Sequence, residues 1–163
     1  MPTLNDDGFN IINRHQGRLP VDLEAIARDL GVRVDYVPMG LGRSGAIYRD
    51  PENGGPSGFR IEVDSSEAKV RQRFTLAHEI AHFILHRDKI GKSGVIDNAM
   101  YRSSLSDRFE AQANRLAASI LMPERLVTSA RFQGDTAHLA SLFGVSESAM
   151  DIRLKSLSEA GRL

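Results

Sequence analysis

A five-residue pattern constrains this chain more than any other feature: residues 78 to 82 read His-Glu-Ile-Ala-His. Two histidines four residues apart lie on one face of an α-helix, about 6 Å apart along its axis, so both imidazole rings can reach a single metal ion. Glu79 lies roughly 100° further round that helix, where its carboxylate can reach a water at the metal rather than the metal itself. The pattern therefore predicts two metal ligands, His78 and His82, and a catalytic base, Glu79.

The surrounding sequence predicts a buried helix for this pattern. Asp64, with Glu67 three positions later, forms a capping-box pattern that indicates a helix N-terminus. Beyond it, apolar side chains occupy nearly every face of the predicted helix (Phe74, Leu76, Ala77, Ile80, Ala81, Phe83, Ile84 and Leu85). A helix that is apolar all round is buried. Because buried polar side chains are costly without partners, we expect a coordinated ion to hold the two histidines and the glutamate.

The remaining ligand has to come from elsewhere in the chain. The longer metzincin pattern, HExxHxxGxxH, is excluded because Leu85 and Asp88 occupy its glycine and histidine positions. His86 lies about 12 Å along the helix axis from His78, too far for one ion bound at ~2.1 Å by each ring. We expect His86 to act instead as a cation at the helix C-terminus or as a hydrogen-bonded core histidine next to the ligands.

A glutamate on a second helix would complete a His₂Glu metal site. Glu110 is the candidate, because it lies near the start of a helix predicted over residues 107–122. Ser106 is the expected N-cap of this helix, and Pro123 is expected to end it. Asn114, one turn after Glu110, could accept a hydrogen bond from a ligand histidine ring, or it could make an ordinary hydrogen bond between helices.

Composition narrows the class of protein. A chain of 163 residues is long enough for one well-buried core and hardly for two. Its 21 basic and 21 acidic residues cancel, so we expect no general attraction to nucleic acid or to anionic membranes. It contains no cysteine, which excludes disulfides and thiolate ligands. No signal peptide is visible before Asn13 and no segment reaches membrane-spanning length, so the cytoplasm is the expected location.

The rest of the chain predicts an α+β fold, with a small antiparallel sheet of about three strands packed on helices. Alternating apolar residues place the strands at residues 32–36, 44–49 and 59–63. The turn-rich run between the last two predicts an antiparallel hairpin. Helices are expected at residues 8–15 and 22–30, the second ended by Gly31. We expect residues 1–130 to form one domain around the site, with residues 1–18 as a helical lead-in.

Two segments outside the predicted core could carry function. Residues 89–105 connect the two ligand helices and form either a mobile lid or a plain surface connection. Residues 131–163 read as a helix, a turn at Gly144 and a new helix capped by Ser146, which is helix-turn-helix spacing. From Asp135 to the end there are 4 acidic and 3 basic residues, a balance that gives little phosphate binding. We therefore expect this segment to pack on the domain or to dock a substrate, not to bind DNA directly.

Longer runs of sequence carry a resemblance to a known family. The run RQRFTLAHEIAHFILH and the run EAQANRLAASILMP resemble the ImmA/IrrE metallo-endopeptidases. Upstream, PVDLEAIARDLGVRVDYVP and SGAIYRD are similar to the N-terminal part of that family. The resemblance implies a minimal zincin-like core in which His78, His82 and Glu110 bind a metal ion. It implies Glu79 as the catalytic base, and Zn²⁺ as the ion, with Mn²⁺ also possible for such a donor set.

The same resemblance implies a function. Members of the family cut helix-turn-helix repressors of the XRE class, in stress responses or in the induction of mobile elements, so we expect such a protein as the substrate. A toxin-like or partner-binding member of a two-gene unit, with weak or no peptidase activity, is the alternative. A transcriptional regulator that uses residues 135–157 is a third reading. An endopeptidase also needs an oxyanion donor, which the sequence leaves open among Tyr48, Arg73, His86 and Tyr101.

Overall fold

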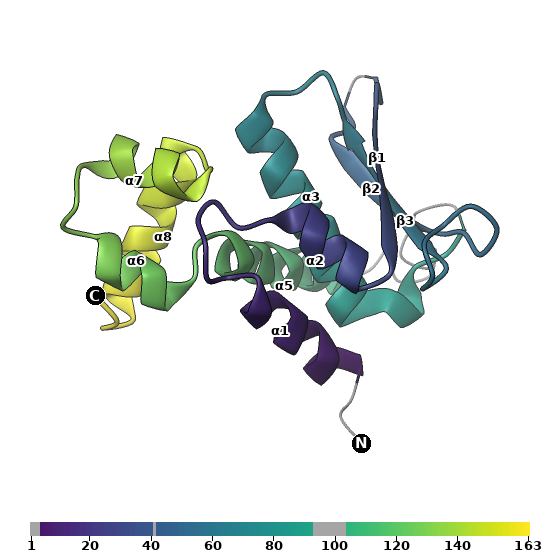
Figure 1. Cartoon of the computed structure of the whole chain (residues 1–163), viewed down its shortest axis with the longest axis horizontal. Coiled ribbons are helices and arrows are strands. Elements are labelled where there is room, and N and C mark those ends of the chain that lie inside the picture. Colours follow the sequence, from purple (N-terminus) through teal and green to yellow (C-terminus); the bar gives the residue numbers. More distant parts are fainter. Residues whose placement is uncertain (1–3, 41, 93–103) are drawn as a thin grey trace.

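The computed structural model describes residues 4–40, 42–92 and 104–163 (Figure 1). A small sheet lies at one side of the molecule with helices packed next to it, and the C-terminal helices lie at the end away from that sheet. Within the described ranges the elements are α1 (Leu4–Arg14), α2 (Leu23–Asp29), β1 (Val32–Val37), β2 (Gly45–Arg49), β3 (Phe59–Asp64), α3 (Lys69–His86), η1 (Arg87–Lys89), α5 (Ser104–Leu121), α6 (Glu124–Ala130), α7 (Thr136–Phe143) and α8 (Glu147–Glu159). The predicted α+β class, with three strands, is confirmed.

The three strands form a mixed sheet in the order β1-β3-β2. Strands β2 and β3 pair antiparallel, with Gly45 opposite Val63, as the turn-rich connection between them predicted. Strand β1 pairs parallel with β3, with Val32 opposite Phe59, so the expectation of a wholly antiparallel sheet is corrected at this pair. The physical reason is that β3 inserts between β1 and β2. Parallel neighbours cannot be joined by a tight hairpin, and alternation of apolar residues along β1 carries no information about strand direction.

Helix α3 runs through the centre of the core. Leu76, Ala77 and Ile80 are almost completely buried, and α5 packs along the helix (Figure 1). Phe83 contacts Phe59 of β3 edge to face, with ring centroids 5.2 Å apart. The apolar faces predicted from the sequence are therefore covered by the sheet on one side and by α5 on another, which confirms a buried helix around the five-residue pattern.

Two predicted helix starts are corrected. The carboxylate of Asp64 accepts hydrogen bonds from the backbone N–H of Ser66 at 3.0 Å and from its hydroxyl at 2.8 Å. These bonds form a turn directly after β3, so α3 begins only at Lys69 and has no side-chain cap. Helix α5 begins at Ser104, which places Ser106 inside the helix rather than at its N-cap. None of the described helices combines the length and apolar character needed to cross a membrane.

Helices α7 and α8 have the helix-turn-helix arrangement that the sequence predicted. Gly144 between them has φ of 68°, in the left-handed region that favours glycine. Ser146 caps α8 by accepting a hydrogen bond from the backbone N–H of Ala149 at 3.0 Å. Arg73 of α3 donates to the Gly144 carbonyl oxygen at 3.1 Å and to the Val21 carbonyl oxygen at 3.0 Å. The turn between the two C-terminal helices is thus attached to the central helix.

Candidate metal centre

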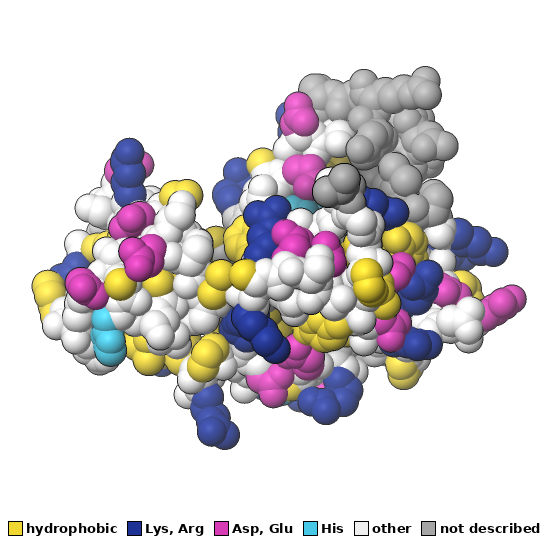
Figure 2. Space-filling model, turned by 90° about the horizontal axis from the view of Figure 1, so that it is seen from above, with side chains coloured by type: hydrophobic (Ala, Val, Ile, Leu, Met, Phe, Trp, Pro, Cys, Tyr) yellow, Lys and Arg dark blue, Asp and Glu magenta, His cyan; other side chains and the backbone are white. Residues whose placement is uncertain are grey.

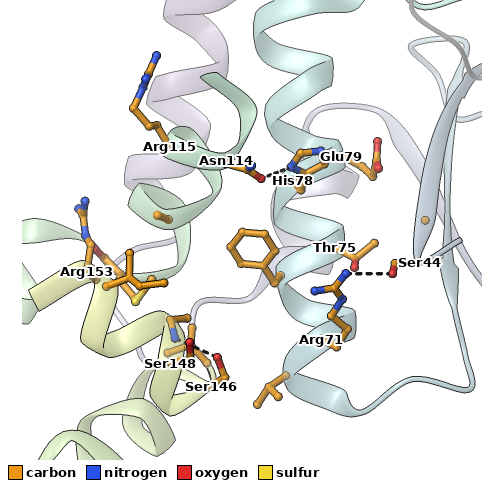
Figure 3. Close-up of a pocket in the computed structure, with 18 of the residues that line it drawn as sticks. Ser44, Arg71, Thr75, His78, Glu79, Asn114, Arg115, Ser146, Ser148 and Arg153 are labelled. Carbon is orange, nitrogen blue, oxygen red and sulfur yellow. Dashed lines mark hydrogen bonds between the residues drawn. The ribbon is translucent and has the colours of Figure 1, made fainter. Parts of the chain in front are cut away.

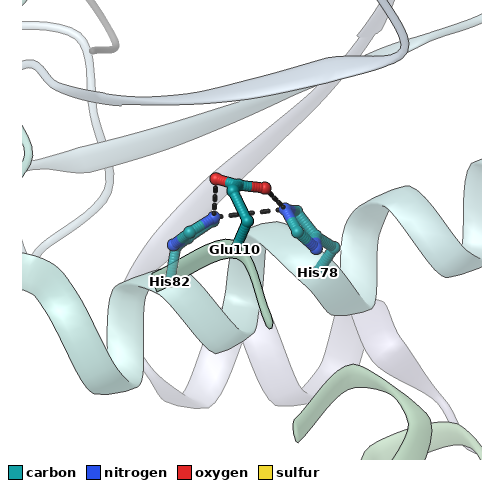
Figure 4. Close-up of side chains that lie close together, drawn as sticks. All are labelled: His78, His82 and Glu110. Atoms are coloured by element: carbon teal, nitrogen blue, oxygen red, sulfur yellow. Dashed lines mark hydrogen bonds and ion pairs between the residues drawn. The ribbon is translucent and has the colours of Figure 1, made fainter. Parts of the chain in front are cut away.

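Two neighbouring helices bring three ligating side chains to one point (Figure 4). His78 and His82 come from α3, and Glu110 comes from α5. The Nε2 atoms of the two histidines lie 3.1 Å apart. The Glu110 carboxylate reaches both rings, with Oε1 3.0 Å from His82 Nε2 and Oε2 3.1 Å from His78 Nε2. The structure therefore brings together the three residues that the sequence named as candidate ligands.

These three side chains fit a metal ion. Ligand atoms bound at ~2.1 Å around a tetrahedral ion lie about 3.4 Å from one another, close to the separations of 3.0 and 3.1 Å found in this group. Two imidazole nitrogens and a carboxylate oxygen are a donor set that suits zinc. Among the described residues no further His, Asp or Glu belongs to the group, and the chain has no cysteine. Three protein ligands with one position left over is the arrangement of catalytic rather than structural zinc sites.

The charges of the group favour a cation. Hydrogen bonds from His78 and His82 hold the pKa of the Glu110 carboxyl well below its usual range. Burial alone would lower the pKa of His78, but its hydrogen bond to Glu110 and the negative charges of Glu79 and Glu110 outweigh burial and raise that pKa. The side chain of Glu110 is 49% exposed, whereas that of His82 is 5% exposed. The group therefore has a buried floor and an open side that a substrate can reach.

Glu79 lies beside this group and is not one of the three converging ligands. Its side chain is buried, and burial raises the pKa of its carboxyl, although the neighbouring His78 and His82 oppose the shift. Glu79 lines the same cavity as His78 and Glu110 (Figure 3). A carboxylate with a raised pKa at the edge of a solvent-accessible cavity is suited to accepting a proton and returning it.

The comparison with known proteins agrees with this geometry. Residues 27–155 match the family described as the IrrE N-terminal-like domain, a peptidase family. The chain belongs to this family. The resemblance found in the sequence is thereby confirmed, and with it the assignment to a family of metalloproteases.

Two relatives are each described as the radiation response metalloprotease IrrE. The protein from Deinococcus radiodurans is 37% identical over 131 residues, which cover 79% of this chain and 37% of that protein. The protein from Deinococcus deserti is 38% identical over 98 residues, which cover 60% of this chain and 31% of that protein. This IrrE-like chain thus spans about a third of the length of the curated relatives it matches.

A solved structure shares the fold. A transcriptional regulator from Mycobacterium tuberculosis superposes with a TM-score of 0.59 at 18% identity, covering 93% of this chain and 46% of that chain. At this level of identity the likeness concerns the fold alone. The arrangement of helices and sheet in this IrrE-like chain therefore occurs within a larger protein, over almost the whole of the present sequence.

His86 lies against one of the candidate ligands of this IrrE-like site. It lies 3.0 Å from His82, Nδ1 to Nδ1, and its Nε2 lies 2.8 Å from Gln112 Oε1. If His82 presents the lone pair of Nε2 to an ion, its Nδ1–H must donate to His86, whose Nε2–H then donates to Gln112. His86 is buried, and burial lowers its pKa. A buried histidine with these two contacts fits the expectation of a hydrogen-bonded core histidine better than that of a cation at the helix end.

Asn114 makes the corresponding contact to the other histidine. Its Oδ1 lies 2.8 Å from His78 Nδ1 (Figure 3). The side-chain carbonyl can accept a hydrogen bond only from a protonated Nδ1, which leaves Nε2 of His78 unprotonated and facing Glu110. This contact is a hydrogen bond between helices, as the sequence allowed, and its partner is the ring of a candidate ligand. Both candidate histidine ligands thus have an acceptor at the far side of the ring.

Gln112 was missed by the sequence reasoning and gives a testable expectation. Replacing Gln112 with leucine removes the acceptor for His86 and weakens the orientation of His82, so zinc affinity should fall by about 10-fold or more. Gln112→Glu keeps an acceptor and should restore the affinity to within a few-fold of the unmodified chain. Competition with a chromophoric chelator measures both. As a matched control, Gln133→Leu changes an exposed glutamine far from the site. Equal affinities of Gln112→Leu and Gln133→Leu would contradict the role given to Gln112.

Strand β2 lies directly against the site helix at Gly45. A Cβ added to Gly45 would lie 2.4 Å from Thr75 Cγ2 and 2.9 Å from the Glu62 carbonyl oxygen, and 3.8 Å from Glu79 Cγ. The absence of a side chain therefore sets how closely this strand approaches the candidate base. The close approach at Gly45 could be expected only from the register of the strand, which the sequence does not give.

We expect Gly45→Ala to lower the free energy of unfolding by about 1–3 kcal/mol, the usual cost of overpacking. Denaturant unfolding measures this. Adding Thr75→Ser removes the methyl group that would be struck first and should recover part of the loss. Gly17→Ala is the control, because nothing lies within 4 Å of a Cβ at that position. Equal stability of Gly45→Ala and Gly17→Ala would show that the strand can shift freely.

Of the oxyanion donors proposed from the sequence, the three that lie among the described residues do not line the cavity. Tyr48 accepts a hydrogen bond from Arg43 at 3.1 Å and lies under the Arg60 guanidinium. Arg73 is engaged by two backbone carbonyls, and His86 lies behind His82. Tyr101 and most of the segment 89–105, the lid or surface connection, lie outside the described residues.

Proposed function

We propose that this chain is a zinc-dependent endopeptidase in which His78, His82 and Glu110 hold the ion and Glu79 is the catalytic base. The observation that supports it is one arrangement: three converging donors with an open side, next to a buried carboxylate of raised pKa that faces the same cavity. A purely structural zinc would need a closed, four-ligand cage.

The chemistry follows from these positions. When bound, the ion would lower the pKa of an adjacent water and polarise the carbonyl of the scissile peptide bond. Glu79 accepts a proton from the attacking water and later delivers it to the leaving amine nitrogen. Asn114 and His86 hold the rings of His78 and His82 in the required orientation and tautomer.

We further propose that the substrate is a partner protein, an XRE-type helix-turn-helix repressor, cut in a stress or mobile-element response. The sequence resemblance to the ImmA/IrrE family supports this substrate class, and the two relatives described as radiation response metalloproteases support a protease in a stress response. Such a repressor acts in the cytoplasm, which is where we place the reaction.

The decisive experiment incubates the zinc-loaded protein with an XRE-type helix-turn-helix repressor of the same organism, taken from a neighbouring gene where there is one. A single cut, located by mass spectrometry and abolished by a chelator, would support the proposal. Reloading the chelated protein with Zn²⁺ or with Mn²⁺ identifies the ion that restores cleavage. An intact repressor in a stable complex with the metal-loaded protein would instead favour the partner-binding alternative, and neither cleavage nor binding would remove this repressor as the substrate.

A further inference from the structure

A groove leads away from the candidate metal centre between three helices that are distant in sequence. It has a volume of about 1130 Å³ and passes between α3, α5 and α8 (Figure 3). One end is formed by His78, Glu79 and Glu110. The other end reaches Ile152 and Ser156 in the C-terminal helix. We call this the α3–α8 groove. Its continuity with the candidate centre means that a peptide held there would extend to the site of cleavage.

The walls of the α3–α8 groove carry apolar side chains from all three helices. They are Val70 and Phe74 from α3, Ala118 from α5, Met122 just after α5, and Ala149 and Ile152 from α8. Ile152 is 68% exposed and Val70 is 39% exposed. Two large aliphatic side chains are thus left in contact with water on walls that belong to different helices. Covering such side chains is favourable, so the groove can hold an apolar anchor of a bound segment.

Positive and negative side chains lie in different parts of the groove. Those away from the candidate metal centre are all arginines, namely Arg43, Arg71, Arg115 and Arg153. The acidic ones are Glu79 and Glu110, at the centre itself. The whole chain has no net charge, so these arginines do not reflect an excess of basic residues in the chain. A bound segment would therefore meet positive charge on both sides of its apolar anchor.

Three of these four arginines, Arg43, Arg71 and Arg153, are held by hydrogen bonds, and Arg71 also pairs with a carboxylate. Arg153 donates from Nε to the Met122 carbonyl oxygen at 3.1 Å, which leaves the terminal nitrogens of its guanidinium available. Arg71 donates to the Ser44 hydroxyl at 3.3 Å (Figure 3) and lies 3.6 Å from the Glu67 carboxylate. Among the described residues no carboxylate lies within 4.0 Å of the guanidinium groups of Arg43, Arg115 or Arg153. Arginine pairs with carboxylates through a planar, two-pronged geometry.

From this arrangement we propose that the α3–α8 groove recognises an acidic segment of the substrate, with Asp or Glu side chains flanking an apolar anchor. The proposal rests on the endopeptidase function proposed above and names the class of sequence that the enzyme selects next to the bond it cuts. Nucleic acid fits less well, since Phe74 is the only Phe, Tyr or Trp side chain among the described lining residues and bases stack on such side chains. The carboxylates of Glu79 and Glu110 would also repel a phosphate backbone at the end of the groove.

The test measures binding separately from cleavage. The zinc-loaded Glu79→Gln protein is titrated into a short fluorescein-labelled peptide of leucine, alanine and glutamate, and anisotropy is recorded. The same peptide with lysine in place of glutamate, and a labelled single-stranded oligonucleotide, are the comparison probes. We expect the glutamate peptide to bind about 10-fold or more tightly than the lysine peptide at low salt, with the difference shrinking as salt is added.

Substitutions then locate the binding. Arg115→Gln combined with Arg153→Gln should reduce the preference for the glutamate peptide to about 2-fold or less. Because Arg153 also bonds the main chain, Arg115→Gln alone, at an exposed position, should give an intermediate loss in a protein of unchanged folding. Arg28→Gln combined with Arg125→Gln removes the same charge from exposed positions outside the groove and should leave the preference intact.

Three results would overturn the proposal: no measurable binding of the glutamate peptide, an equal loss in the groove and control variants, or displacement of the peptide by the oligonucleotide. Failure of the proposed function looks different. If the unmodified protein cuts no substrate but the charge preference and its dependence on Arg115 persist, the endopeptidase assignment fails and the groove stands as a binding site. If cleavage occurs but the preference is absent, only the groove assignment fails.

Discussion

Glu79→Gln is expected to leave zinc bound at one equivalent while cleavage of the partner protein slows by about 10²–10⁴-fold or more. The amide keeps the size of the side chain but cannot accept the proton of the attacking water. The three converging ligands lie on other residues, so the ion should remain. Metal analysis after dialysis and the initial rate of cleavage are measured on the same preparation.

The control for this substitution is Glu159→Gln, which makes the same chemical change at an exposed position on α8. Its rate and its metal content should both match those of the unmodified protein. A Glu79→Gln protein that cleaves within a few-fold of this control would remove Glu79 from the chemistry and return the search for a base to the cavity. Loss of zinc would show that Glu79 supports the site rather than the proton transfer.

Glu110→Ala is expected to have the second large effect, on metal binding itself. Loss of residues that merely orient zinc ligands costs 10–100-fold in affinity, so removal of a carboxylate that contacts both histidine rings should cost more than about 100-fold. Without it, His78 and His82 alone remain on one helix. Chelator competition gives the dissociation constant, and thermal unfolding with and without added zinc gives an independent readout.

Two comparisons make the Glu110 result specific. Glu110→Asp keeps a carboxylate on a shorter side chain and should bind zinc more tightly than Glu110→Ala, and Glu159→Ala should behave as the unmodified chain. If zinc raises the unfolding temperature of Glu110→Ala and of the unmodified chain equally, Glu110 does not hold the ion. The three-residue cluster would then be an ordinary hydrogen-bonded group.

The three candidate metal ligands could be anticipated because their positions follow helical periodicity. His78 and His82 share a face by their spacing, and Glu110 falls at the start of a helix whose end Pro123 marks. Gln112 could not be anticipated in this way. Two residues after Glu110, it points roughly 200° away round the helix, yet its long side chain reaches His86. Periodicity describes directions at Cα and not the reach of flexible side chains.

Other features escaped prediction because they depend on tertiary contacts. The parallel pairing of β1 with β3 is set by the path of the chain between the strands. The arginines of the α3–α8 groove lie on segments that only folding brings together. The capping-box pattern was misleading for a different reason. The Asp64 carboxylate accepts hydrogen bonds from Ser66, in a turn after β3, and does not cap the helix. The Asp64 carboxylate thus bonds a donor two residues away rather than a backbone N–H of the helix that begins at Lys69.

The hydrogen bond from Arg73 to the Gly144 carbonyl oxygen has a consequence for truncation of the C-terminal helices. Arg73 lies on the helix of the candidate ligands, and its half-buried guanidinium spans the carbonyl groups of Val21 and Gly144. A chain ending at residue 130 would leave that guanidinium with one acceptor fewer, at a cost of about 1–3 kcal/mol. It would also remove the wall of the groove that α8 supplies. The C-terminal helices therefore support both the helix that carries the candidate metal ligands and one wall of the groove, and we expect truncation to disturb both.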